Sequence, residues 1–180
     1  PLVDTFVSKK LTGGGGGSHL ETSPEQLEDR LLSRDWGKPR APGDKLPVVT
    51  VDFGTPLLPS LAGAGYERDG NHCWSVPCAT SIEELRVQPF DTNHPLWVRY
   101  IALFEKVLEH WTWDTYLPGV TAMLGPTDIL AGMLGPETLA MEMVMNPDAV
   151  RARAADAAEL FLGALKAQIE SLIASIEATE

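Results

Sequence analysis

The segment 48–53 constrains the fold of this chain more than any other part of the sequence. Its residues, VVTVDF, are rich in β-branched side chains and nearly continuous in their apolar character. A strand that is buried on both faces of a parallel sheet has this character, whereas a strand with one solvated face alternates apolar and polar residues. Prolines and glycines fill the preceding loop at 37–47, and Gly54, Thr55 and Pro56 end the run. We therefore predict a buried parallel strand at 48–53.

Helical segments separate this strand from a second one and then follow it. The second strand-like run covers 116–124 and ends at a Gly-Pro pair. Capping signals and apolar residues at spacings of three to five locate the helices. We expect helices that begin at Ser23 and at Ser81, helices at 95–110, 127–134 and 136–145, and a last helix from Asn146. With a small hairpin at 66–78, this order predicts an α/β fold built on a parallel sheet.

The N-terminal segment contains five consecutive glycines at 13–17, followed by Ser18. Such a run has a high conformational entropy and no side chains to bury, so it is typical of a linker. A phosphate-binding loop would need interleaved glycines and a Lys-Ser/Thr ending, and neither is present. We therefore expect residues 1–22 to form a flexible, glycine-rich segment.

Composition limits the partners of the chain. The net charge is -11, so nucleic acid and anionic membrane surfaces are not expected to bind. No apolar run approaches the roughly 20 residues that span a bilayer. Two cysteines, Cys73 and Cys78, do not make a disulfide framework. We expect a reduced, cytoplasmic protein.

Two segments together resemble the uroporphyrinogen decarboxylase superfamily. The first is VDFGTPLLP at 51–59, followed by Gly63, Gly65 and Glu67. The second is GVTAMLGPTDILAGMLG at 119–135, followed by Glu137, Leu139, Met141 and the helix start NPDAV at 146–150. The order and spacing of these motifs carry the resemblance, which covers roughly residues 46–176. It implies that residues 23–180 form the N-terminal portion of a TIM-type (β/α) barrel.

The resemblance also implies that the barrel is incomplete. A whole barrel has eight strands and about 250 residues, whereas two or three barrel strands are evident here. The expectation is a partial barrel with open sheet edges, through which the chain could associate with itself. No cofactor is expected in this chain, and zinc or a corrinoid is expected only in the complete parent.

Functional groups of such barrels lie at the carboxyl ends of the strands. The candidate catalytic residue is therefore Asp52, at the end of the first predicted strand. Phe53 and Gly54 follow it, and Thr127 and Asp128 lie at the next strand-to-helix turn, as candidate substrate-binding residues. The alternative interpretations are an ordinary polar strand terminus at Asp52 and simple helix capping by Thr127 and Asp128.

Two departures bear on the activity that the resemblance implies. Decarboxylases of the superfamily have an aspartate where this chain has Gly54, and a substrate-contacting tyrosine where it has Ala131. The segment that begins at Arg34 weakly resembles the Arg-x-x-Gly-Arg motif with which the family binds substrate carboxylates. Lys38 replaces the second arginine, so the bidentate guanidinium is lost. These differences favour an enzyme of the methyltransferase-like branch, which acts with a corrinoid or thiol methyl carrier. A tetrapyrrole decarboxylase and a non-catalytic association module remain the alternatives. For either enzyme we expect a small-molecule substrate, which is a methyl donor in the first case and a tetrapyrrole in the second.

The other reactive and aromatic side chains are expected to be structural. A structural zinc site commonly has four protein ligands, and at His72, Cys73 and Cys78 the sequence offers two sulfurs, one histidine and no evident fourth group. His94 and His110 flank the helix at 95–110 and are expected at the surface. Packing is expected for two groups of residues, namely Trp97, Trp111 and Trp113, and Met123, Met133, Met141, Met143 and Met145.

Overall fold

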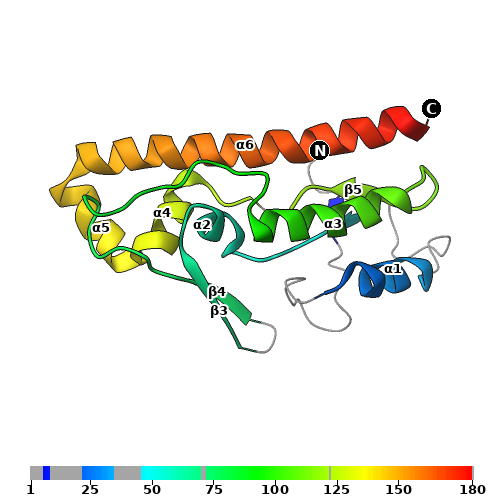
Figure 1. The fold of residues 1–180 in the computed structure, drawn as a ribbon, viewed down its shortest axis with the longest axis horizontal. Helices are drawn as coiled ribbons and strands as arrows, with labels where there is room; N and C mark the ends of the chain where they lie inside the picture. Colours follow the sequence, from blue (N-terminus) through cyan, green and yellow to red (C-terminus); the bar gives the residue numbers. More distant parts are fainter. Residues whose placement is uncertain (1–5, 9–21, 35–45, 70–71, 122, 180) are drawn as a thin grey trace.

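A computed structural model describes residues 6–8, 22–34, 46–69, 72–121 and 123–179 (Figure 1). The centre is a sheet of three parallel strands in the order β1-β2-β5. These are β1 (Phe6–Ser8), β2 (Leu46–Thr50) and β5 (Leu117–Gly119). Each strand lies beside the one that follows it in this set, with helices in between. The predicted α/β class is confirmed, and the described residues form no closed barrel.

Both predicted strands are shorter in the structure than the sequence suggested. β2 ends at Thr50 because the chain turns after it, towards Gly54, whose φ of 78° is in the left-handed region. β5 has three residues, and its central residue Pro118 has no N–H to donate. The expected flexible segment 1–22 lies mostly outside the described residues, and Phe6–Ser8 within it form β1.

The first two helices and the hairpin are local structures with clear causes. In α1 (Pro24–Leu32), the Gln26 N–H donates to Ser23 Oγ and the Gln26 side chain accepts from the Ser23 N–H, as predicted. After β2 comes the short helix α2 (Leu57–Leu61). The predicted hairpin is confirmed as β3 (Gly65–Asp69) and β4 (His72–Val76), paired antiparallel.

The helix expected at Ser81 is wrong, because the chain forms only a turn there. The Glu84 N–H lies 3.4 Å from Ser81 Oγ, which is half of a capping box. The other half fails because the Glu84 carboxylate accepts from the Thr80 hydroxyl at 2.7 Å, instead of from the serine N–H.

The remaining helices cover the sheet and each other. They are α3 (Pro95–Glu109), α4 (Pro126–Leu134), α5 (Pro136–Met145) and α6 (Pro147–Thr179). All four were predicted, and Figure 1 shows α3 and α6 running side by side. Close approach of α2 and α4 requires Gly132, where a Cβ would lie 2.6 Å from Pro59 Cγ. The core lies where α3 packs on β2 and on α6.

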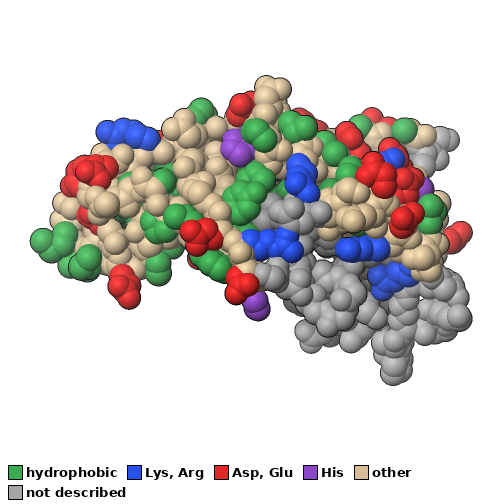
Figure 2. Space-filling model, turned by 60° about the horizontal axis from the view of Figure 1, so that its bottom comes forward, with side chains coloured by type: hydrophobic (Ala, Val, Ile, Leu, Met, Phe, Trp, Pro, Cys, Tyr) green, Lys and Arg blue, Asp and Glu red, His purple; other side chains and the backbone are tan. Residues whose placement is uncertain are grey.

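Four of the residues expected in the core are exposed. Met141, Met143 and Met145 of α5 are exposed. Met141 and Met145 lie four residues apart and so share one face of the helix, and that face is exposed. The buried positions of α5 are Leu139 and Glu142, three residues apart. Figure 2 shows apolar side chains at the α5 end of the molecule. Of the tryptophans, Trp97 and Trp111 are buried as expected, whereas Trp113 is 75% exposed; it contacts Trp111 edge to face.

A buried polar network joins α3, α6 and the chain after β5. Gln168 of α6 is fully buried, and its Oε1 accepts from the Tyr100 hydroxyl at 2.6 Å and from the Thr121 N–H at 3.0 Å. Its Nε2 donates to Ala164 O and to Met123 Sδ. Burial raises the pKa of Tyr100 far above its usual value, so the phenol remains a neutral donor. One glutamine side chain therefore satisfies groups from two other elements.

Replacing Gln168 with leucine should destabilise the protein more than replacing Tyr100 with phenylalanine. Gln168→Leu leaves the buried Tyr100 hydroxyl without its acceptor and leaves the Thr121 N–H with only its longer hydrogen bond to Tyr100 Oη, at 3.3 Å. It should therefore lower the free energy of unfolding by about 2–4 kcal/mol. Tyr100→Phe removes one donor and leaves the Thr121 N–H bonded to Gln168, so a loss of about 1–2 kcal/mol is expected. Urea unfolding followed by circular dichroism measures both, and equal losses would contradict this account of the network.

Candidate functional site

Asp52 lies just beyond the carboxyl end of β2, and its carboxylate folds back onto the main chain. Asp52 Oδ1 accepts a hydrogen bond from the Gly54 N–H at 2.8 Å. The residue is 5% exposed. The positive φ of Gly54 lets the chain make this turn without the strain that most other residues would suffer. The carboxylate is thus held at the strand end by the turn itself.

Phe53 belongs to the core between the sheet and α3. Its ring is fully buried and meets Tyr100 of α3 edge to face, with the ring centroids 5.7 Å apart. On the other side of the sheet, a Cβ at Gly119 would lie 2.8 Å from Val48 Cγ1 and 2.9 Å from Thr50 Oγ1. Phe53 therefore packs under α3, and Gly119 of β5 lies against Val48 and Thr50 of β2.

Thr127 and Asp128 are exposed in the first turn of α4. The N-cap of this helix is Gly125, which provides no side-chain hydrogen bond. The helix α4 follows β5, and β5 pairs in parallel with β2. The carboxyl ends of the two strands therefore lie at the same edge of the sheet, and so do Asp52 and the first turn of α4. Thr121 lies between β5 and α4, and its buried Oγ1 has no hydrogen-bond partner among the described residues.

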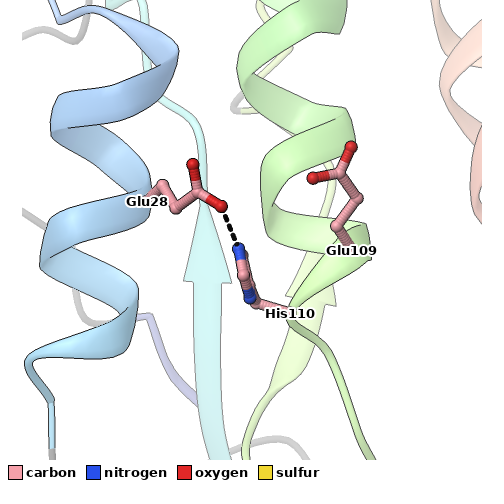
Figure 3. Close-up of side chains that lie close together, drawn as sticks. All are labelled: Glu28, Glu109 and His110. Carbon is pink, nitrogen blue, oxygen red and sulfur yellow. Dashed lines mark hydrogen bonds and ion pairs between the residues drawn. The ribbon is translucent and has the colours of Figure 1, made fainter.

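A second group of reactive side chains lies away from these residues, between α1 and the end of α3 (Figure 3). Glu28 projects from α1, Glu109 is the last residue of α3, and His110 is its C-cap. Nε2 of His110 lies 2.8 Å from Oε1 of Glu28. One ligand atom from each residue can be chosen so that all lie within 4.8 Å of one another.

Lys106 lies beside this group. Its Nζ is 2.6 Å from Glu109 Oε2 and 3.9 Å from Glu28 Oε2. The hydrogen bond with Glu109 raises the pKa of Lys106 above its ordinary value. Carboxylates of two helices thus already share one positive charge.

The residues of this second group are far apart in the sequence, so no local pattern predicts it. His110 was expected to be an isolated surface residue, whereas its side chain is only 26% exposed and meets Glu28. Glu109 and His110 are adjacent in the sequence, but Glu28 is 82 residues from His110 and on another helix. No spacing rule links the two segments. By contrast, His72, Cys73 and Cys78 form no comparable ligand group in the described part of the chain.

No family model, characterised protein or solved structure matches the chain. Among its described residues, no helix is both long and apolar enough to cross a membrane.

The turn at Asp52 can be tested by two substitutions. Asp52→Ala removes the acceptor of the Gly54 N–H at a buried position, which should lower the free energy of unfolding by about 1–3 kcal/mol. Asp52→Asn keeps an oxygen acceptor, so its loss should stay below about 1 kcal/mol. Urea unfolding of both variants distinguishes them. If asparagine costs as much as alanine, the charge, not the turn, sets the role of Asp52 in stability.

Proposed function

We propose that this chain supplies the first strands and helices of a TIM-type barrel enzyme that resembles the uroporphyrinogen decarboxylase superfamily. Within it, we favour the methyltransferase-like branch, in which a methyl group passes to or from a corrinoid or thiol carrier. Asp52 is the proposed catalytic residue, and the proposed substrate-binding residues are Phe53, Gly54, Thr127 and Asp128. The observation that carries the proposal is the order of the parallel strands.

The sheet has the arrangement that the beginning of such a barrel requires. Strands of a barrel follow one another around it, each joined to the next by a helix. In the order β1-β2-β5, each strand neighbours the next parallel strand, with α1 in the first crossover and α3 in the second. The hairpin β3-β4 and the helix α2 are additions within that second crossover. Val49, Val51 and Phe53 are buried, and Phe53 packs on Tyr100 of α3. We assign the face of Val48 and Thr50 to the barrel interior.

The position of Asp52 also supports the proposal. Superfamily decarboxylases have an aspartate where this chain has Gly54, two residues further on. The hydrogen bond from Gly54 N–H to Asp52 Oδ1 brings the earlier carboxylate to the backbone of that position. Phe53 is the weakest of the proposed substrate contacts, because its ring is fully buried against Tyr100.

The open sheet supports a second candidate, a non-catalytic association module. Within the described residues, β1 and β5 are each paired on one side only. Unpaired strand edges are templates for pairing with another chain. This candidate requires assembly but no chemistry at Asp52.

Methyl transfer tests the first proposal directly. We expect the full-length protein that carries this chain to consume methylcobalamin in the presence of a thiol acceptor, which visible absorbance of the corrinoid reports. Asp52→Asn should lower kcat/KM by about tenfold or more, because it removes the charge while the turn remains. Asp69→Asn, an exposed change on β3, is the matched control and should leave the rate unchanged.

Two results would contradict methyl transfer. Decarboxylation of uroporphyrinogen, with no reaction of methylcobalamin, would show that the tetrapyrrole alternative is right. An absence of both reactions, together with concentration-dependent oligomers in light scattering, would support the association module instead.

A further inference from the structure

Two carboxylates and an imidazole come together between α1 and the end of α3. Glu28 and Glu109 bring carboxylates from the two helices, and the His110 imidazole lies between the helices in Figure 3. A side-chain ammonium, that of Lys106, already lies within 4.0 Å of both carboxylates. The site is also at the C-terminal end of the 15-residue helix α3, where the helix dipole favours positive charge. The carboxylates and the C-terminal end of the helix both favour positive charge here, and the Lys106 ammonium already responds to them.

We propose that Glu28, Glu109 and His110 bind a divalent transition-metal ion of the zinc type. One imidazole nitrogen and two carboxylate oxygens are ligands that zinc accepts, and the nitrogen ligand favours zinc over magnesium or calcium. The site differs from any metal expected in the parent enzyme, since it uses only residues of α1 and α3.

The distances are compatible with small side-chain movements. Tetrahedral ligands at about 2.1 Å from zinc lie about 3.4 Å from one another. The separation of 2.8 Å between His110 Nε2 and Glu28 Oε1 must therefore open slightly. The wider separations, at most 4.8 Å, must close by up to about 1.4 Å relative to that zinc geometry. Long glutamate side chains that are partly exposed, as these are, can make such shifts by rotation.

Lys106 competes with the metal for the same carboxylates. Its ammonium would be displaced towards solvent, which its flexible stem permits. This competition limits the affinity of the site for the metal. It also distinguishes a metal site from an ordinary ion-pair cluster, which would not bind metal when the lysine is removed. Removing the lysine should strengthen metal binding.

The expected role of the ion is structural. His110 begins the segment that leads to the first residue of β5, so the site lies at the end of the sheet opposite Asp52. The amino-terminal face of such a sheet contributes to stability more than to catalysis. An ion shared by Glu28 and His110 would fasten α1 to α3, and the proposal does not depend on the function proposed above.

Calorimetric titration of the metal-free protein with Zn²⁺ tests the site. We expect one saturable site with a dissociation constant on the order of 10 µM. Glu28→Gln and His110→Gln should each weaken binding about tenfold or more, because each removes one ligand atom. Lys106→Met should strengthen it about threefold or more, because the competing charge is gone. It keeps all three ligands, so it tests the site even if a ligand variant folds poorly.

Glu105→Gln is the matched control, an exposed glutamate one turn before Glu109 on the same helix. It should leave the dissociation constant unchanged within about twofold. Substitution with Co²⁺ gives a second readout, since ligands from this site produce no thiolate charge-transfer absorption. Such a band, or Zn²⁺ binding that persists in His110→Gln and disappears in Cys73→Ser, would place the metal at the hairpin and overturn the proposal. Absence of saturable Zn²⁺ binding would overturn it as well.

Discussion

The packing of Tyr100 between the sheet and α6 is the interaction on which the rest of the structure depends. Its ring meets Phe53 beyond β2 and stacks on Phe104, and its hydroxyl donates to Gln168 of α6. A parallel sheet needs helices over its surface, because its strands carry apolar side chains on both faces. Tyr100 connects that cover to the strands with aromatic contacts, and to the last helix with a hydrogen bond that has no access to water. The position of α3 thereby fixes both β2 and α6.

Two ends of the sheet follow from this arrangement. At the carboxyl ends of β2 and β5 lie Asp52, with its carboxylate held by the turn at Gly54, and the first turn of α4. At the other end, the C-terminus of α3 meets α1 through Glu28 and His110. Chemistry on a small molecule is proposed for the first end, and a metal ion that joins the helices is proposed for the second. The proposed catalytic site at Asp52 and the proposed metal site at His110 lie at opposite ends of the sheet and share no residue. Either proposal can therefore be wrong without affecting the other.

Much of the fold could be predicted from local signals. The capping box at Ser23, the prolines that begin the later helices and the apolar run after residue 47 are features that act within a few residues, and each gave the right element type. Predictions failed where the outcome depended on distant or competing partners. The Glu84 carboxylate, which the helix expected at Ser81 needed, accepts from the Thr80 hydroxyl instead. In α5, Leu139 and Glu142 are buried, and Met141, Met143 and Met145 are exposed. The candidate site shows the same division, since Asp52 was evident at a strand end, whereas the contact of Glu28 with His110 exists only after folding.

The central claim is that β2 and β5 are parallel neighbours under α3. Nuclear Overhauser contacts between backbone atoms of labelled protein test it most directly. The account predicts contacts in ascending register, with Val48 opposite Leu117 and Thr50 opposite Gly119. Contacts that join Val48 to Gly119 and Thr50 to Leu117 would mean antiparallel strands, and would contradict both the sheet and the barrel proposed from it.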